Sequence, residues 1–298
     1  MSSKQPPQRV AVTGASGLIG TALVGHLRSE GHTVQRFVRR PAKAPDEISW
    51  DPITGSVDLA ALEGVNAVIH LAGAGVGDKR WTKKYRAEIL NSRLLGTTAI
   101  ANAVSKVNPS VFISASAIGW YGESGNRAVT ESDRSGDDFL AVVCREWEGA
   151  ADLAGDVRTV KIRTGLVLDP TGGALGRMLP LFRLGVGGKL GNGKQWWSWI
   201  TMHDHVRAMC HLMESRISGP VNLTSPNPVT NQEFTAALAR AMHRPALFPA
   251  PAFALKLALG GFSTEILGSK KVVPEALTND GFSFDYPHVS KALEVLVN

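Results

Sequence analysis

A short apolar stretch that runs into closely spaced glycines constrains this chain more than any other feature. RVAVT at 9–13 has the pattern of a buried strand, and GASGLIG follows it at 14–20, where a helix of apolar period begins. Glycines three residues apart permit a tight turn, close approach of the backbone to a pyrophosphate, and close packing of helix on strand. The motif predicts that a dinucleotide binds to the free amides of this turn. The residues expected to contact it are Gly14, Ser16, Gly17, Leu18, Ile19 and Gly20.

The end of the second predicted strand, TVQRFV at 33–38, indicates which dinucleotide is bound. An acidic residue there would hold a ribose hydroxyl, but Arg39 and Arg40 follow instead. A guanidinium can bind a 2′-phosphate through two parallel hydrogen bonds. We therefore expect NADP(H) rather than NAD(H). The alternative is that both arginines are solvated in a surface loop.

Short apolar runs alternate with longer segments of helical period, which predicts an α/β, doubly wound, Rossmann-type parallel sheet covered on both faces. The expected strands are 9–13, 33–38, 67–72, 111–115 and 159–168, and the expected helices are 18–30, 84–107 and 139–154. After Asp169 the chain becomes rich in Gly, Trp and Pro. We expect residues 1–169 to form the cofactor domain and residues 170–298 a smaller α+β substrate lobe. This boundary is soft, since the strand VNL at 221–223 could rejoin the main sheet.

Bulk composition narrows the class of protein. With 298 residues, 44% of them hydrophobic and 19% charged, the chain can bury a large core. The net charge is +6, but the basic residues are scattered and no basic groove interleaved with aromatics accompanies them. We expect no nucleic-acid partner. No stretch resembles a signal sequence or a membrane span, so we expect a cytoplasmic protein without a membrane partner.

Four motifs, taken in order, resemble those of the extended short-chain dehydrogenase/reductases. They are TGASGLIG at 13–20, HLAG at 70–73, SRLLGT at 92–97 and SASAIGWYG at 114–122. With WEGAA, GNGKQWWSWIT and GFSFDYPHVSKAL, the chain more narrowly resembles epimerase-family proteins of the nucleoside-diphosphate-sugar epimerase (SulA-like) type. The likeness covers nearly the whole chain. It implies bound NADP(H), a C-terminal lobe that closes the substrate pocket, and a homodimer formed through the helices at 84–107 and 139–154.

The resemblance also implies further cofactor contacts at the ends of three strands. The matching residues are Leu71, Ala72, Gly73, Ser114, Arg163 and Gly165. Arg93 stands where extended family members usually carry asparagine. Two interpretations of Arg93 stay open: its charge reaches a phosphate or ribose of the cofactor, or it pairs with a nearby carboxylate.

The tyrosine and lysine that the resemblance would supply on one helix are missing. In the superfamily the lysine holds the nicotinamide ribose and lowers the tyrosine pKa, so that the phenol can exchange a proton during hydride transfer. Counting back from Glu148 places Cys144 at the lysine position and Leu140 at the tyrosine position. We expect protons to come instead from Tyr121, with Ser116 as its hydrogen-bond partner. The alternative is that Tyr121 is only a wall of the pocket.

The segment GNGKQWWSWITMHDH is expected at the mouth of the substrate pocket, where indoles could stack on a substrate. Candidate substrate contacts are Trp120, Arg177 and Trp199, although packing between the lobes explains at least one tryptophan of this segment. Adjacent positions point different ways, so His203, Asp204 and His205 predict no metal site. Asp204 is expected to cap a helix.

Two functions remain open. The first is an NADP(H)-dependent oxidoreductase or epimerase-like enzyme acting on a small, anionic or nucleotide-sugar-like molecule with unusual proton donors. The second is an NADP(H)-binding sensor or regulatory protein without turnover. The glycine motif supports binding of the cofactor, whereas Leu140 and Cys144 argue against the usual mechanism.

Overall fold

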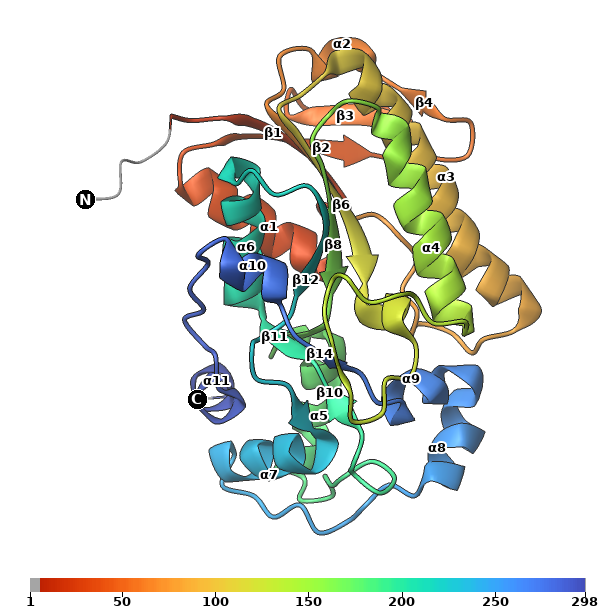
Figure 1. Ribbon diagram of the computed structural model, residues 1–298, viewed down its shortest axis with the longest axis vertical. Helices are drawn as coiled ribbons and strands as arrows, with labels where there is room; N and C mark the ends of the chain where they lie inside the picture. The colour runs from red at the N-terminus through yellow and green to blue at the C-terminus, as the bar shows by residue number, and fades with distance from the viewer. Residues whose placement is uncertain (1–5, 298) are drawn as a thin grey trace.

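The computed structural model describes residues 6–297. An eight-stranded sheet forms the upper part of the molecule (Figure 1). Neighbouring strands are parallel except at one edge, where the last pair is antiparallel. In order across the sheet they are β12 (Gly219–Leu223), β8 (Thr159–Thr164), β6 (Val111–Ala117), β5 (Ala67–His70), β1 (Arg9–Thr13), β2 (Thr33–Val38), β3 (Glu47–Asp51) and β4 (Ser56–Val57).

Helices cover both faces of this sheet (Figure 1). On one face lie α1 (Leu18–Ser29) and α6 (Met202–Glu214), and on the other α3 (Lys83–Val107) and α4 (Phe139–Ala151). The short helix α2 (Leu59–Leu62) precedes β5, and the 3-10 turn η2 (Asp152–Ala154) extends α4. The inner strands are apolar on both sides because both sides are covered, as in the burial of every residue of β5. The predicted doubly wound α/β fold is confirmed. Within residues 6–297, no helix combines the length and apolar character needed to cross a bilayer.

A second lobe lies below the carboxyl ends of β6 and β8 (Figure 1). It contains three two-stranded sheets, formed by β9 (Leu166–Asp169) with β11 (Trp199–Thr201), β10 (Trp196–Trp197) with β13 (Val229–Thr230), and β7 (Ala128–Val129) with β14 (Lys271–Val272). Its helices and turns are η1 (Ile118–Tyr121), α5 (Gly173–Arg183), α7 (Asn231–Ala241), α8 (Ala252–Leu259), η3 (Gly260–Phe262), α9 (Ser263–Leu267) and α11 (Val289–Val297). The short helix α10 (Glu275–Asn279) belongs to the main sheet unit, because its Leu277 is buried in the core beside β12 and α6. The core of this lobe is apolar and includes Leu175, Phe182, Trp199, Phe234 and Leu293.

The chain passes between the two lobes more than once. β12 pairs with β8 in parallel, so VNL at 221–223 does rejoin the main sheet. Val206 and Met209 of α6 are buried in the same core as β1 and α1. A single cut at residue 169 therefore does not separate the lobes, because α6 and β12 pack in the main sheet unit.

The predicted strand at 159–168 is two strands in the structure. β8 ends at Thr164, and β9 begins at Leu166 and pairs with β11 instead of continuing in the main sheet. Gly165 lies at the break, where an added Cβ would stand 2.5 Å from the carbonyl oxygen of Ser198. Only glycine allows the two backbones to approach this closely.

Candidate cofactor-binding site

The turn between β1 and α1 is built so that no side chain fills it. Gly14 has φ +66°, a conformation that favours glycine, and its carbonyl accepts a hydrogen bond from the Gly17 amide at 2.9 Å. An added Cβ on Gly20 would lie 2.1 Å from the Gly14 oxygen. Gly17 is the N-cap of α1 and makes no side-chain cap, and Ser16, Gly17 and Leu18 are exposed. The amides of the first helical turn are thus open to an anion, which fits the pyrophosphate of a dinucleotide.

Thr13 and His70, which the sequence analysis did not single out, join this turn to the next loop. The Thr13 hydroxyl oxygen lies 3.0 Å and 3.2 Å from the backbone nitrogens of Leu71 and Ala72, which donate to it. Its own hydrogen then points to Nδ1 of His70, 2.8 Å away. Burial lowers the pKa of His70 to about 3, so the ring is neutral and carries its hydrogen on Nε2. In the sequence, Thr13 and His70 could have been found as polar residues at the ends of strands that are otherwise apolar.

The two arginines after β2 have different surroundings. Arg40 donates two hydrogen bonds to the Glu47 carboxylate, at 2.8 Å and 2.6 Å. The hydrogen bond from Arg40 is the main reason that the pKa of Glu47 falls to about 2. Arg39 is exposed and has no hydrogen-bond or ion-pair partner within residues 6–297. Arg39 is therefore the guanidinium available to a 2′-phosphate, whereas Arg40 is already paired.

The loop after β5 passes over the side chain of Arg93. An added Cβ on Gly73 would lie 3.5 Å from Cγ and Cζ of Arg93. Nη1 of Arg93 donates to the carbonyl oxygens of Ala74, at 2.9 Å, and Ile89, at 3.1 Å. No carboxylate pairs with Arg93 in the part of the chain that the structure describes. The interpretation in which Arg93 pairs with a local carboxylate is wrong.

A buried polar network connects the carboxyl ends of β6, β8 and β12. Arg163 is 2% exposed, and its Nε and Nη2 donate to the two oxygens of Glu148 at 2.8 Å and 3.0 Å. Ser116 donates to the same carboxylate at 2.6 Å. The Tyr121 hydroxyl accepts a hydrogen bond from Arg163 at 3.0 Å and donates to Asn222 at 2.7 Å. All five groups are buried, so this network holds three strands, α4 and η1 together.

This network changes the roles expected for Tyr121, Ser116 and Arg163. Burial raises the pKa of Tyr121 to about 12, although Arg163 opposes the shift. Its hydroxyl is bonded on both sides, and Ser116 binds Glu148 rather than Tyr121. The geometry thus does not favour the predicted proton-donating pair. Each nitrogen of the Arg163 guanidinium also donates within the protein, and the group stacks on Trp120, with Cζ 3.9 Å from the centre of the indole ring.

The inner face of α4 offers neither proton nor charge where the superfamily pair would stand. Leu140 is 8% exposed and Cys144 is 3% exposed. Burial raises the pKa of the Cys144 thiol to about 12, and its sulfur lies 3.6 Å from the Ala117 carbonyl oxygen. Both residues also lie against Gly119, where an added Cβ would come 3.2 Å from the Leu140 Cβ. They are packing residues. Ser114 of β6 is 1% exposed, and its hydroxyl has no hydrogen-bond partner in the described chain.

Aromatic residues join the two lobes beside this site. The ring of Trp81 lies 5.2 Å from that of Phe139 and 6.0 Å from that of Phe262, measured between ring centroids. Arg177 is exposed and donates to the Gly77 carbonyl oxygen at 3.1 Å. Trp199, in contrast, is 0% exposed. The predicted stacking of Trp199 on a substrate does not fit the structure, because its indole is packed in the core of the second lobe.

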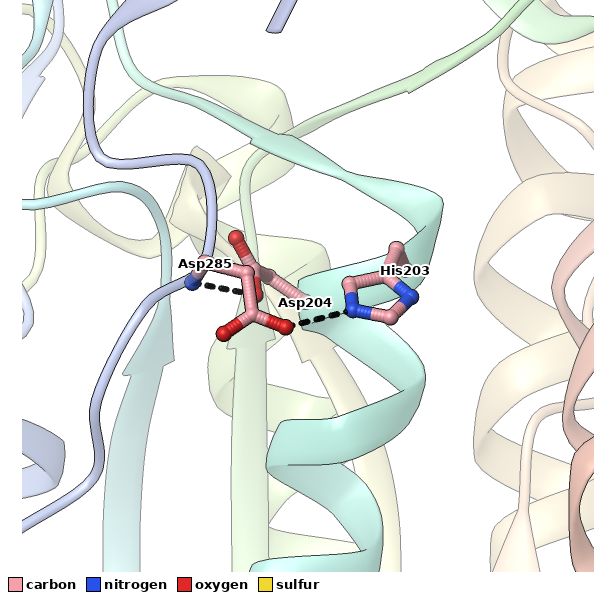
Figure 2. A group of neighbouring side chains, drawn as sticks. All are labelled: His203, Asp204 and Asp285. Atoms are coloured by element: carbon pink, nitrogen blue, oxygen red, sulfur yellow. Dashed lines mark hydrogen bonds and ion pairs between the residues drawn. The ribbon is translucent and has the colours of Figure 1, made fainter. Parts of the chain in front are cut away.

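The acidic group at the start of α6 is a structural clamp. His203, Asp204 and Asp285 lie together (Figure 2), with His203 Nε2 2.7 Å from an oxygen of Asp285. Asp204 accepts hydrogen bonds from the backbone amides of Asp285 and Tyr286 and from Arg207, at 2.9–3.0 Å. Asp204 does not cap α6 as expected, because Thr201 does so. Both carboxylates already have a cationic partner, because Nη1 of Arg207 lies 2.9 Å from Asp204 and 3.2 Å from Asp285.

The fold and the glycine turn are those of doubly wound dinucleotide-binding proteins that carry a second lobe at the carboxyl edge of the sheet. The NAD dependent epimerase/dehydratase family matches residues 10–142, and a domain of unknown function, DUF1731, matches residues 250–296. An epimerase family protein of Mycobacterium leprae is 42% identical over 289 residues, which cover 95% of this chain and 94% of that protein. This chain therefore belongs to the epimerase family, as the resemblance predicted.

Two solved structures extend this relation. One is the crystal structure of the human epimerase family protein SDR39U1 with NADPH, whose sequence is 33% identical to this chain. The match covers 97% of this chain and 98% of the human chain, with a TM-score of 0.90. The nucleoside-diphosphate sugar epimerase from Corynebacterium glutamicum is 35% identical with a TM-score of 0.80, and covers 98% of this chain and 58% of its own.

Proposed function

We propose that this protein binds NADP(H) and acts as an oxidoreductase or epimerase-like enzyme on a small molecule. The observation that carries the proposal is the glycine turn, which an added Cβ at Gly20 would fill, with the unpaired Arg39 at the end of the neighbouring strand β2. Open amides suit a pyrophosphate, and a free guanidinium suits a 2′-phosphate. The human relative crystallised with NADPH supports the same choice of cofactor.

When bound, NADPH would supply a hydride at its nicotinamide ring. This chain's own part is to hold and position the ligands. Residues 14–20 would hold the pyrophosphate, and the loop at 71–73 would run beside a ribose, with its backbone fixed by Thr13. Neither position of the superfamily pair on α4 suits proton transfer, because Leu140 has no ionisable group and the Cys144 thiol is buried. Protons for the reaction would therefore come from another group of the protein, from solvent or from the substrate.

On the substrate side, we propose that the aromatic group of Trp81, Phe139 and Phe262 borders the small molecule. Trp120 and Arg177 would contact it at the edges, and the exposed Arg177 guanidinium, which also pairs with Asp78 at 3.6 Å, would meet an anionic group. A nucleotide sugar is one such substrate, as the name of the Corynebacterium relative suggests. Homodimer formation through α3 and α4, and a cytoplasmic site of action, stay predictions.

The test is a substrate panel with purified protein. The near-ultraviolet absorbance of NADPH is followed during addition of aldehydes, ketones, enones and nucleotide sugars. Nucleotide-sugar products are also separated by chromatography, because epimerisation leaves the cofactor's net oxidation state unchanged. Turnover of any compound, lost in a Gly20→Ala variant, would support the enzyme. A protein that binds no NADPH would overturn the proposal.

The second candidate is an NADP(H)-binding sensor without turnover, which the apolar replacement of the usual tyrosine and lysine favours. Leu140 and Cys144 are packed as core residues, so neither position of the usual pair on α4 carries a group suited to proton transfer. Tight NADPH binding without turnover across the panel would select this candidate. A change of protease sensitivity or oligomeric state on NADPH binding would support it further.

A further inference from the structure

Exposed apolar side chains gather at the end of the second lobe that lies away from the main sheet, where α8 is found (Figure 1). Of the twelve large hydrophobic side chains that are exposed in residues 6–297, seven fall within 181–186 and 247–257. Six of these form what we call the apolar patch: Leu184, Val186, Leu247, Phe248, Phe253 and Leu257. A single exposed hydrophobic side chain is ordinary, whereas a contiguous group marks an interaction surface.

The two segments that carry the apolar patch lie side by side. The Gly191 amide donates to the Ala250 carbonyl oxygen at 2.8 Å, and the Ala250 amide donates to the Lys189 carbonyl oxygen at 2.9 Å. An added Cβ on Gly188 would stand 2.1 Å from the Phe248 carbonyl oxygen. The loop after α5 is therefore joined through its backbone to the chain that enters α8. The exposed side chains of these two segments belong to one surface.

α8 extends this surface. Phe253 and Leu257 are four residues apart, so they lie on the same side of the helix, and they are 74% and 75% exposed. No residue of α8 is buried, and Lys256, next to Leu257, is exposed as well. Side chains that project this far do not line a groove, because the walls of a groove would cover them. They suit a surface into which they can be inserted.

The charge of these segments has one sign only. Residues 170–203 and 234–264 contain seven lysine and arginine residues and no aspartate or glutamate. The net charge of the whole chain is +6, so the rest of the chain is almost neutral. Beside the apolar patch, Arg183, Lys189, Arg244 and Lys256 have no carboxylate partner within residues 6–297. The patch is thus surrounded by cations whose charge the protein itself does not balance.

The single sign of charge shows which partner fits the apolar patch. A second copy seated on the same patch through a two-fold axis would bring cations against cations, which disfavours self-association there. An anionic lipid surface offers an apolar boundary for phenylalanine and leucine, and negative headgroups for lysine and arginine. The expectation of no membrane partner rests on the lack of a signal or spanning segment, and a surface contact requires neither.

We propose that the apolar patch and the cations around it bind the surface of an anionic phospholipid membrane, with α8 lying along the headgroup region. Phe253 and Leu257 would enter the boundary between headgroups and acyl chains, and Arg244 and Lys256 would contact the headgroups. The proposal goes beyond the proposed function and does not depend on NADP(H) binding or on turnover.

The test is co-sedimentation of the full-length protein with vesicles of phosphatidylcholine alone or of equal parts of phosphatidylcholine and phosphatidylglycerol. The unmodified protein should bind the mixed vesicles at least about 10-fold more tightly, and added salt should weaken this binding. Phe253→Ser/Leu257→Ser should weaken binding by at least about 10-fold, because two apolar side chains no longer leave water. Arg244→Gln/Lys256→Gln should weaken binding by about 5-fold for each charge removed.

Matched controls lie on the main sheet unit. Ile53→Ser removes an apolar side chain that is 80% exposed, and Lys83→Gln/Lys84→Gln removes two exposed cations at the start of α3. Both controls should bind the mixed vesicles like the unmodified protein. All these side chains are exposed, so the midpoint of thermal unfolding should be unchanged in every variant. If the serine variant unfolds, the charge variant and the salt dependence still decide.

Failure of the unmodified protein to sediment with the mixed vesicles would overturn the proposal, as would equal binding by the patch variants and the controls. Two further results would also overturn it by assigning the patch to another partner. One is a dimer in sedimentation velocity that Phe253→Ser/Leu257→Ser dissociates, without vesicle binding. The other is binding of a synthetic amphipathic peptide of glutamate and leucine, again without vesicle binding. None of these results bears on NADPH binding, which is measured separately.

Discussion

The buried pair of Arg163 and Glu148 gives the sharpest test of the idea that this network supports the fold. Replacing Arg163 with Met would leave the Glu148 carboxylate, 5% exposed, with only the Ser116 hydroxyl at 2.6 Å. Breaking a buried ion pair on one side costs about 3–5 kcal/mol, because the remaining charge is buried without compensation. We expect a similar loss for Glu148→Met, which leaves the Arg163 cation with Tyr121 and a carbonyl oxygen.

The double variant Arg163→Met/Glu148→Met tests whether the two losses of stability are coupled or simply add. Removing both charges leaves no uncompensated ion, so the double variant should lose only about 1–3 kcal/mol, mainly from packing on Trp120 and the bond to Tyr121. The free energy of unfolding is measured by urea denaturation, followed by tryptophan fluorescence and circular dichroism. Additive losses in the double variant would refute the account of the pair.

Three further results are expected. Arg39→Ala should weaken NADPH binding by about 10- to 100-fold and leave NADH binding nearly unchanged. Arg40→Ala, which loses the bond to Glu47, should weaken NADPH binding far less. Fluorescence titration measures both affinities, and equal effects of the two substitutions would contradict the assignment of Arg39. Tyr121→Phe should destabilise the fold by about 1–3 kcal/mol and preserve any turnover, because the hydroxyl serves Asn222 and Arg163; loss of turnover at unchanged stability would restore Tyr121 as a proton donor. Burial lowers the pKa of His70 to about 3 and of His205 to about 4, below the unfolded value, so the unfolded chain binds more protons and stability falls as the pH falls. Each histidine should lower the free energy of unfolding by about 2 kcal/mol between pH 7 and pH 5. A free energy of unfolding that stays constant over this interval would refute the burial argument.

Structural features that depend on residues close together in the sequence are the ones that the sequence predicts best. The glycine turn, the alternation of strand and helix, and the lack of the tyrosine and lysine on α4 all depend on local spacing, and the structure agrees with each. The fold class and the family followed from these features. The different environments of Arg39 and Arg40 did not, because they depend on Glu47 in β3, a strand that the apolar pattern did not indicate.

Contacts between distant residues account for most of the differences. Tyr121 was predicted as a proton donor because it follows a strand, but its hydroxyl is fixed by Asn222, 101 residues away. Asp204 resembled a helix cap, yet it binds backbone amides more than 80 positions later. Trp199 is a core residue because its strand, β11, pairs with β9 inside the second lobe. Such partners leave no local pattern, so the fold alone reveals them.

The most direct test of the account is calorimetric titration of the purified, ligand-free protein with NADPH and, separately, with NADH. The glycine turn and the unpaired Arg39 predict a single class of sites that binds NADPH about 10- to 100-fold more tightly than NADH. No heat of binding with either cofactor, or a preference for NADH, would contradict it.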